Sequence, residues 1–540
     1  MEDKKNYLIG ANILDNLTTG MYTDSRIIFR EYIQNACDSI DQAYKEGILA
    51  PKTGAVEIYT DTIERSIVIH DNGMGIKTDE FDRTLGNIAD SDKTLGETKG
   101  FRGIGRLCGL AYCKTLVFSA KAKGENTISH MRFDAEKMRH LVNQNQSRTD
   151  VKYSAVDVLT AIITRDSEPS KDIEDHWFEV KLVSVNEENH ELLHKMSVID
   201  YLSFVAPVPF GKNFSYRSII YEYIKKNGLK LDEYTIKVDG DQIFKDYKTH
   251  VSTGKGEDHI FDVQFKELRD DRDELIAWVW YGLRNFQYVI KADDPQRGLR
   301  LRKENIQIGN EDALQRLFRE DRGTHYFIGE VHAVSRDLIP NSQRDYFNEN
   351  NIRNVFEREA SQYFGETLHR LYHAGNDVSS AIDKIEKYKN QEKEYKKKEK
   401  NGDFIDTRQR QEAEEKVKKA KRTADEAKKK IIATTDKYHG DEESPINKVV
   451  TRIVEQRKAD RYLADNDEGK KGGQDDTPDK PNDQTNGSTN KKMKKHWVDR
   501  LSAVNSKERK LISRVCGVIR ECVDEKTMEI IQQKLEEEFK

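Results

Sequence analysis

The sequence has few cysteines and prolines and no long apolar run. Its five cysteines are an odd number, and their spacing fits neither a disulfide framework nor a zinc site, so we expect buried free thiols in a reducing compartment. No stretch approaches the roughly 18 apolar residues of a membrane span, and the N-terminus has no apolar signal-peptide core. These absences predict a cytoplasmic protein without a membrane partner.

The sequence also lacks an excess of one charge. Lysine and arginine nearly balance aspartate and glutamate, which leaves a net charge of -5. This balance gives no global basicity for nucleic acid, although it leaves a local basic patch open. Charged residues make up 35% of the chain, which is high for a globular protein, so part of the chain should be extended, coiled-coil or disordered.

Shifts in composition predict five parts. Residues 1–192 alternate helical and strand patterns, and residues 193–375 contain strand-like aromatic and β-branched runs. Residues 376–440 are highly charged, with small apolar residues at alternating spacings of four and three; this predicts an antiparallel helical hairpin of coiled-coil type, or alternatively one long solvated helix. We expect a largely disordered linker over 441–495 and short partner-binding helices over 496–540.

The stretch FREYIQNACDSIDQA, residues 29–43, predicts an amphipathic helix. The helical period places Glu31, Asn35 and Asp38 on one side, opposite an apolar half. A polar helix side is usually a solvated surface. Taken alone, the pattern therefore leaves a solvated surface and a functional face both open.

Two glycine-rich stretches can serve nucleotide chemistry beside this helix. In HDNGMGI, Asp71 follows a strand and can accept a hydrogen bond from an adenine amino group, and Gly75 lets the base approach the backbone after the turn at Gly73. Farther along, KGFRGIG opens a predicted helix whose backbone N–H groups can bind phosphate. This glycine-rich stretch comprises Lys99, Gly100, Phe101, Arg102, Gly103, Ile104 and Gly105.

The polar helix side supplies the remaining chemistry. Asn35 offers a neutral amide oxygen, which suits Mg²⁺. Glu31, one turn away, can hold and deprotonate an attacking water, so that ATP hydrolysis is mostly positioning and charge stabilisation. Each signal is weak alone, because glycine-rich turns are structural more often than not. Their order and spacing together favour an ATP site.

These motifs resemble the ninety-kilodalton heat-shock chaperones. The segment from Ile13 to Ala43, DNGMGI and the later LGNIADSDKT are similar to that family, a member of the GHKL ATPase superfamily with gyrase, MutL, MORC proteins and histidine kinases. The lid GFRGIGRL is closer to MutL. The resemblance covers roughly residues 10–365 and implies an α+β chain with a Bergerat-type ATP-binding sandwich and a second, transducer domain. It implies ATP and Mg²⁺ as ligands and adds Met74 and Thr84 to the nucleotide site.

The resemblance extends to GEVHAVSRDLIPNSQRDYF, residues 329–347. This segment is similar to the chaperone segment that carries a catalytic arginine, and residue-by-residue matching places that arginine at Arg344. A guanidinium there would neutralise charge on the γ-phosphate when the domains dock. A surface arginine in a polar loop is the alternative, with Arg300 and Arg302 as second choices.

The sequence also departs from the chaperones. Arg106 stands where they carry an aromatic residue, Asp90 stands where they usually carry lysine, and their C-terminal dimerisation domain has no counterpart. We predict an ATP-driven clamp that closes as a homodimer and remodels a protein client. The alternatives are a MORC-like or antiphage-defence clamp acting on DNA through the lysine-rich hairpin, and a nucleotide-controlled scaffold with little hydrolysis.

Overall fold

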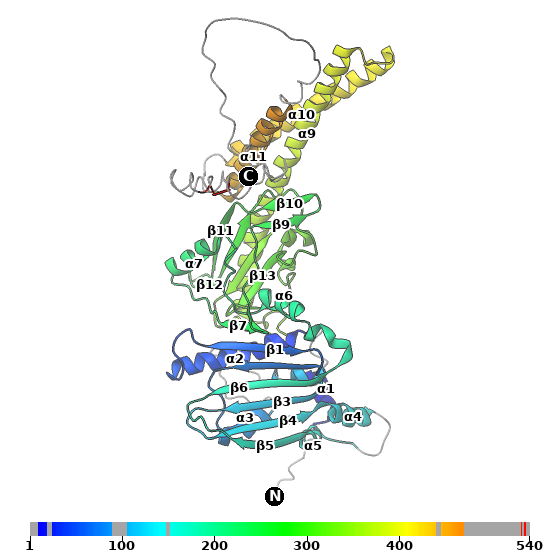
Figure 1. Cartoon of the computed structure of the whole chain (residues 1–540). Coiled ribbons are helices and arrows are strands. Elements are labelled where there is room, and N and C mark those ends of the chain that lie inside the picture. The colour runs from blue at the N-terminus through cyan, green and yellow to red at the C-terminus, as the bar shows by residue number, and fades with distance from the viewer. Residues whose placement is uncertain are drawn as a thin grey trace, which may run out of the picture. The chain divides into compact units, whose positions relative to one another are not determined.

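Two β-sheets and a long helical hairpin form the main elements of the chain (Figure 1). The structure, a computed structural model, describes residues 9–18, 24–88, 105–146, 152–438 and 444–468, with 531, 534 and 535 near the C-terminus. The predicted α+β class is confirmed. The described residues up to Ala464 belong to one compact unit.

The first sheet has eight strands in the order β5-β4-β3-β6-β2-β1-β7-β8. Alternating valine and isoleucine residues predict β1 (Ala55–Asp61) and β2 (Ser66–Asp71), and the structure buries this apolar set on one face. These strands pair antiparallel, so Asp71 at the end of β2 lies opposite Val56 near the start of β1. The remaining strands are β3 (Cys113–Lys121), β4 (Thr127–Asp134), β5 (Ile163–Pro169), β6 (Trp177–Val185), β7 (Thr235–Val238) and β8 (Asp241–Gln242).

Helices pack against this sheet and share its apolar core. The longest is α2, Ile27–Lys45, which contains the predicted helix and extends it at both ends. The others are α1 (Asn12–Thr18), α3 (Thr78–Gly86), η1 (Gly105–Ala111), α4 (Ala135–Gln146), α5 (Ala155–Ile162), η2 (Glu187–Leu193) and α6 (Lys195–Val205). Because α2 packs against β1 and β2, its position is fixed relative to the turn that follows Asp71.

The first sheet includes strands from beyond the predicted domain boundary at residue 192. β7 pairs in parallel with β1, and β8 follows it through the turn Asp239-Gly240. Both turn residues have positive φ, 45° and 84°, as a two-residue hairpin of the primed type requires. The domain boundaries stay a prediction, but the first sheet contains strands from both sides of the boundary predicted at residue 192.

The second sheet has five strands in the order β11-β12-β15-β13-β14. Its central strands are almost entirely buried, as expected for the aromatic-rich run that forms β12. The strands are β11 (Asp262–Arg269), β12 (Leu275–Leu283), β13 (Gly298–Lys303), β14 (Ile306–Gln307) and β15 (Ile328–Ala333). Neighbouring elements are α7 (Arg217–Lys226), the β9 (His250–Thr253) and β10 (Gly256–His259) pair, η3 (Gln315–Leu317) and η4 (Asp321–Tyr326).

A buried ionic cluster joins the chain after β8 to the second sheet. Glu330 on β15 is fully buried and accepts hydrogen bonds at 2.5 to 3.2 Å. The donors are Lys245, Tyr247, Trp280, Arg302 and His332. Burial alone would raise the pKa of Glu330, but the charges of Arg302 and Lys245 lower this pKa well below its usual value.

Arg300 and Arg302, the second choices for a catalytic arginine, are both buried in the second sheet. Arg300 donates to Gln307 Oε1 at 2.7 Å, and Arg302 donates to Glu330 Oε1 at 2.5 Å and to the Phe204 carbonyl at 2.6 Å. These partners are structural groups of the second sheet and its neighbours. Both arginines therefore stabilise the fold.

The charged region after residue 376 forms a helical hairpin. α8 (Asn351–Tyr363) and the π-helix η5 (Phe364–Leu368) lead into α9, His369–Asn401, which packs along α10, Thr407–Tyr438 (Figure 1). Gly402 ends α9 with φ of +72°, a left-handed conformation that favours glycine. Four predicted seam residues form the buried contact: Ala381, Ile385, Ala424 and Ala427. Small side chains there let the two helices approach closely.

The first part of the predicted linker is helical, whereas the sequence predicts a largely disordered segment. Pro445–Glu468 forms helix α11, whose Ile446, Val449, Val450 and Ile453 pack into the core of the second sheet. These four residues repeat at helical spacing, which the high charge of the neighbouring sequence obscured. Most of the predicted linker and of the C-terminal module lies outside the described residues.

The described cysteines agree with the expected free thiols. Cys37, Cys108 and Cys113 are buried and form no disulfide with one another. Burial raises the pKa of Cys113 to about 12, which keeps this thiol protonated and unreactive. Cys516 and Cys522 lie outside the described residues.

Candidate nucleotide-binding site

Helix α2 buries both its apolar and its polar sides. Phe29 and Ile33 are in the core, but Glu31 is only 6% exposed and Asp38 only 9% exposed. Asn35, between them, is half-buried, and its side chain makes no hydrogen bond with the described residues. The polar side of α2 is therefore not an open solvated surface.

Glu31 lies between two guanidinium groups. Its Oε1 is 3.4 Å from Arg30 Nη2 and 3.4 Å from Nε of Arg344. Arg30 also donates to the Gln343 carbonyl at 3.3 Å, so α2 contacts the loop between β15 and α8 at two neighbouring residues. The structure thus brings together Glu31 and Arg344, the two residues predicted as catalytic, although 313 positions separate them in sequence.

The loop holds Arg344 in a defined conformation. Arg344 has φ of +54°, in the left-handed region that side-chain-bearing residues rarely adopt. Its backbone N–H donates to the Asn341 carbonyl at 3.2 Å, and its carbonyl accepts from Gly309 at 2.8 Å. Such conformations cost about 1–3 kcal/mol and persist where the surrounding structure enforces them, often at functional sites.

The turn after β2 is fixed to α2. Asp71, 3% exposed, accepts a hydrogen bond from the Gly73 backbone at 2.9 Å, and the Met74 backbone donates to Ser39 Oγ at 2.9 Å. Ser39 directly follows Asp38, so the Asp71–Gly75 turn lies beside the polar side of α2. Sequence reasoning missed Ser39, whose short hydroxyl side chain gives no distinctive signal.

The glycines of this turn are required by the protein's own packing. Gly75 has φ of +66°, and a Cβ there would lie 2.0 Å from the Lys121 carbonyl oxygen. A Cβ on Gly73 would lie 2.2 Å from Ser39 Oγ. The predicted reason for Gly75, close approach of a base, is thus not needed to explain the residue, since β3 already excludes a side chain.

The lid is described only at its end. Residues 99–104, which contain Lys99, Gly100, Phe101, Arg102, Gly103 and Ile104, lie outside the described residues. Gly105 begins η1, a 3₁₀ helix, at the place where the sequence predicts a helix after the lid. A Cβ on Gly105 would lie 2.5 Å from Glu31 Oε2, so the end of the lid packs against the predicted catalytic carboxylate.

Tyr32 joins η1 to α2. Its hydroxyl donates to the Arg106 carbonyl and accepts from the Gly109 backbone, both at 3.0 Å. Burial raises the pKa of Tyr32 well above its usual value, so the hydroxyl stays neutral and keeps both bonds. Thr84, by contrast, is exposed on α3, and no described contact joins it to Glu31 or Asp71.

Two polar atoms beside Glu31 are buried without a hydrogen-bond partner among the described residues, Arg30 Nε and Gln34 Oε1. Buried polar groups are nearly always paired, so unpaired ones in one place indicate a polar ligand or water. The described part of the site therefore fits a polar nucleotide: Asp71 is an acceptor, Asn35 is an accessible amide, and Glu31 is a buried carboxylate. Sequence reasoning assigned no role to Arg30 or Gln34.

Comparison with known proteins agrees with this geometry. Residues 23–167 match the family described as "Histidine kinase-, DNA gyrase B-, and HSP90-like ATPase". The N-terminal part of this chain is therefore similar to the ATPase domains of that family. The match includes α2, the Asp71 turn and the lid, so the resemblance read from the motifs is confirmed for this ATPase domain.

Curated relatives of the ATPase domain are named "Chaperone protein HtpG". That of Methylorubrum populi is 32% identical over 103 residues, 17% of this chain and 16% of the relative. That of Buchnera aphidicola is 30% identical over 122 residues, which cover 20% of this chain and 19% of the relative. That of Halalkalibacterium halodurans is 27% identical over 143 residues, which cover 24% of this chain and 23% of the relative. The chain thus spans less than a quarter of the length of these relatives.

In the part of the chain that the structure describes, no helix is both long and apolar enough to cross a lipid bilayer.

Proposed function

We propose that this chain is a Mg²⁺-dependent ATPase whose hydrolysis drives a chaperone-like molecular clamp. The contact between Glu31 and Arg344 supports this proposal most strongly, because it brings a buried carboxylate from α2 beside an arginine from the β15–α8 loop. A general base and a cation that stabilises phosphoryl charge are the two side-chain functions that ATP hydrolysis most needs.

Each site residue has a proposed role. Glu31 takes a proton from the attacking water, Asp71 accepts a hydrogen bond from the adenine amino group, and Arg344 neutralises charge on the γ-phosphate. Asn35 would hold the Mg²⁺ ion, which supplies further charge neutralisation at the phosphates. Asp38, Gly73, Met74, Gly75 and Thr84, with the lid from Lys99 to Gly105, complete the proposed nucleotide site.

The Glu31–Arg344 contact also suggests how hydrolysis is coupled to movement. In the described structure Arg344 is paired with Glu31 itself, so a bound triphosphate has to compete for that guanidinium. Binding would thereby change the contact between α2 and the β15–α8 loop. We propose that this change accompanies closure of a homodimer through the N-terminal part of the chain, and that residues 496–540, predicted from sequence to be helical, bind a protein client.

A DNA clamp has less support from the hairpin. Described lysines there pair with acidic residues: Lys396 with Glu392, Lys418 with Glu414 and Lys430 with Asp377. Interleaved charges of this kind form a solvated surface more readily than a phosphate-binding stripe.

The proposal is tested with purified Glu31→Ala protein. We expect ATP binding close to that of the wild type and turnover reduced by about 10²–10⁴-fold, the usual contribution of a general base. Glu46→Ala, at the exposed end of the same helix, is the matched control and should turn over normally. Arg344→Ala should also lose turnover, whereas Arg336→Ala, an exposed arginine of the same loop, should not.

Full activity of Glu31→Ala would remove the assignment of the base. Wild-type turnover near zero with intact ATP binding would instead favour the nucleotide-controlled scaffold. A pull-down with Glu31→Ala and ATP should recover a trapped protein client. Size-exclusion chromatography with light scattering should show whether ATP makes the same variant dimeric.

A further inference from the structure

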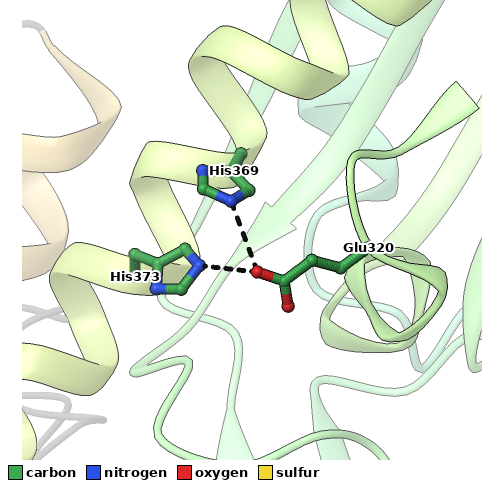
Figure 2. Close-up of side chains that lie close together, drawn as sticks. All are labelled: Glu320, His369 and His373. Carbon is green, nitrogen blue, oxygen red and sulfur yellow. Dashed lines mark hydrogen bonds and ion pairs between the residues drawn. The ribbon is translucent and has the colours of Figure 1, made fainter.

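Three metal-ligating side chains converge where the second sheet meets the hairpin. His369 and His373 are one turn apart on α9, and Glu320 directly precedes η4 (Figure 2). Both histidine Nε2 atoms point at the same carboxylate oxygen, Glu320 Oε1, at 3.5 and 3.3 Å. Among the described residues, this is the one group of three or more His, Cys, Asp or Glu side chains with ligand atoms within 4.8 Å of one another.

The two spacings between imidazole nitrogen and carboxylate oxygen match a tetrahedral metal site better than a pair of hydrogen bonds. Zinc binds imidazole nitrogen at about 2.0–2.1 Å and carboxylate oxygen at about 2.0–2.2 Å, so neighbouring ligand atoms in a tetrahedral site lie about 3.3–3.5 Å apart. The two Nε2–Oε1 distances, 3.5 and 3.3 Å, fall in that range. Good N–H···O hydrogen bonds are shorter, typically about 2.9–3.0 Å.

The surroundings also suit a bound cation. Arg322 Nε donates to the other carboxylate oxygen, Glu320 Oε2, at 2.7 Å, which holds the carboxylate so that Oε1 faces the two imidazoles. Such outer partners commonly orient metal ligands. The π-helix η5 ends at Leu368, immediately before His369, and π-helical turns occur frequently at functional sites. The three side chains are 23 to 38% exposed, so an ion can enter from solvent.

We propose that Glu320, His369 and His373 bind a divalent transition-metal cation, with Zn²⁺ as the best fit, and with water as the fourth ligand. Imidazole ligands select zinc, cobalt, nickel or copper over magnesium and calcium. The bound metal joins the segment before η4 to the first turn of α9. It therefore fixes the base of the α9–α10 hairpin to the second sheet. This site is separate from the proposed nucleotide site and its Mg²⁺.

The test uses the full chain, freed of metal with a chelator and kept without nucleotide, because ATP itself binds zinc. Calorimetric titration with Zn²⁺ should give one site per chain, Mg²⁺ should not compete for it, and Co²⁺ should produce the visible absorption bands of a tetrahedral complex. Replacing residues that only hydrogen-bond to metal ligands typically weakens metal affinity by about 10–100-fold. The variant His369→Gln/His373→Gln removes two ligands themselves, so its Zn²⁺ Kd should rise by about 100-fold or more.

The matched control is His250→Gln/His259→Gln, a histidine pair on β9 and β10 whose ring centroids are 6.4 Å apart. It should keep wild-type Zn²⁺ affinity. Glu320→Gln preserves size and should also weaken binding, so it decides the matter if the double variant does not fold. Zn²⁺ affinity unchanged in Glu320→Gln or in the α9 variant, or the absence of saturable binding to wild type, would overturn the proposal.

Discussion

Two buried glutamates, Glu31 in α2 and Glu330 in β15, have very different surroundings. Glu330 accepts hydrogen bonds from five side chains at 2.5 to 3.2 Å. The described cations nearest to Glu31, Arg30 and Arg344, are 3.4 Å away. Beside Glu31, Arg30 Nε and Gln34 Oε1 lack partners among the described residues.

The difference separates two uses of buried charge. A fully hydrogen-bonded cluster such as that of Glu330 makes the structure rigid and specifies one arrangement. A loosely paired carboxylate beside unpaired polar atoms costs stability unless something else binds there. We therefore interpret the Glu330 cluster as structural and the surroundings of Glu31 as prepared for a ligand.

The largest effect on the free energy of unfolding is expected from Glu330→Gln. This change removes the negative charge that compensates Arg302 and Lys245 and should lower the free energy of unfolding by about 3–5 kcal/mol, the usual result of breaking a buried ion pair. Urea unfolding followed by circular dichroism measures it. Glu267→Gln, which loses a more exposed ion pair with Arg269 on the same sheet, is the control and should cost at most about 1 kcal/mol. Equal losses in the two variants would contradict a special role for the cluster.

An acid-dependent effect of intermediate size is expected from His332. Burial lowers the pKa of this histidine from 6.5 to about 4, whereas the unfolded chain should titrate near 6.5. The unfolded state therefore binds more protons between these pH values, so stability falls as the pH drops through this window, by at most about 3 kcal/mol. In His332→Asn, the free energy of unfolding should decrease less between pH 7 and pH 4 than in the wild type, as measured by urea unfolding at each pH. An identical pH profile in the variant would show that other groups cause it.

The smallest effect on stability is expected from Glu31→Gln. Its ion pairs at 3.4 Å are longer than strong charge-assisted hydrogen bonds, and glutamine keeps the same volume and can still accept from Arg30, so the free energy of unfolding should change by about 1 kcal/mol or less. The same urea series as for Glu330→Gln makes the comparison direct. A loss as large as that of Glu330→Gln would make Glu31 a structural residue.

Local pattern predicted the elements that carry the site. The apolar period of α2 and the alternating residues of β1 and β2 placed Glu31 and Asp71 on the correct elements. The helical repeat of Ile446, Val449, Val450 and Ile453 is equally readable, but it falls within the range 441–495 that is predicted to be a linker. The sequence also predicts a helix after the lid, and Gly105 and Gly109 lie in the 3₁₀ helix η1.

Local sequence patterns do not predict contacts between segments that are distant in the sequence. The position assigned to Arg344 came from resemblance, because nothing in the spacing relates residue 344 to α2. The cluster around Glu330 draws on β12, β13, β15 and the segment after β8, and no repeat in the sequence relates its residues to one another. The triad of Glu320, His369 and His373 likewise depends on where η4 meets α9.

The path of the chain after β8 has a mechanical consequence. Gln242 is the last residue of the first sheet, and Lys245, three positions later, is anchored to Glu330 in the second. Three residues span at most about 11 Å even when fully extended, so this connection is short. A displacement of β8 would pull directly on the Lys245–Glu330 pair. A movement of the first sheet is therefore transmitted to the second sheet through these three residues and the Lys245–Glu330 ion pair.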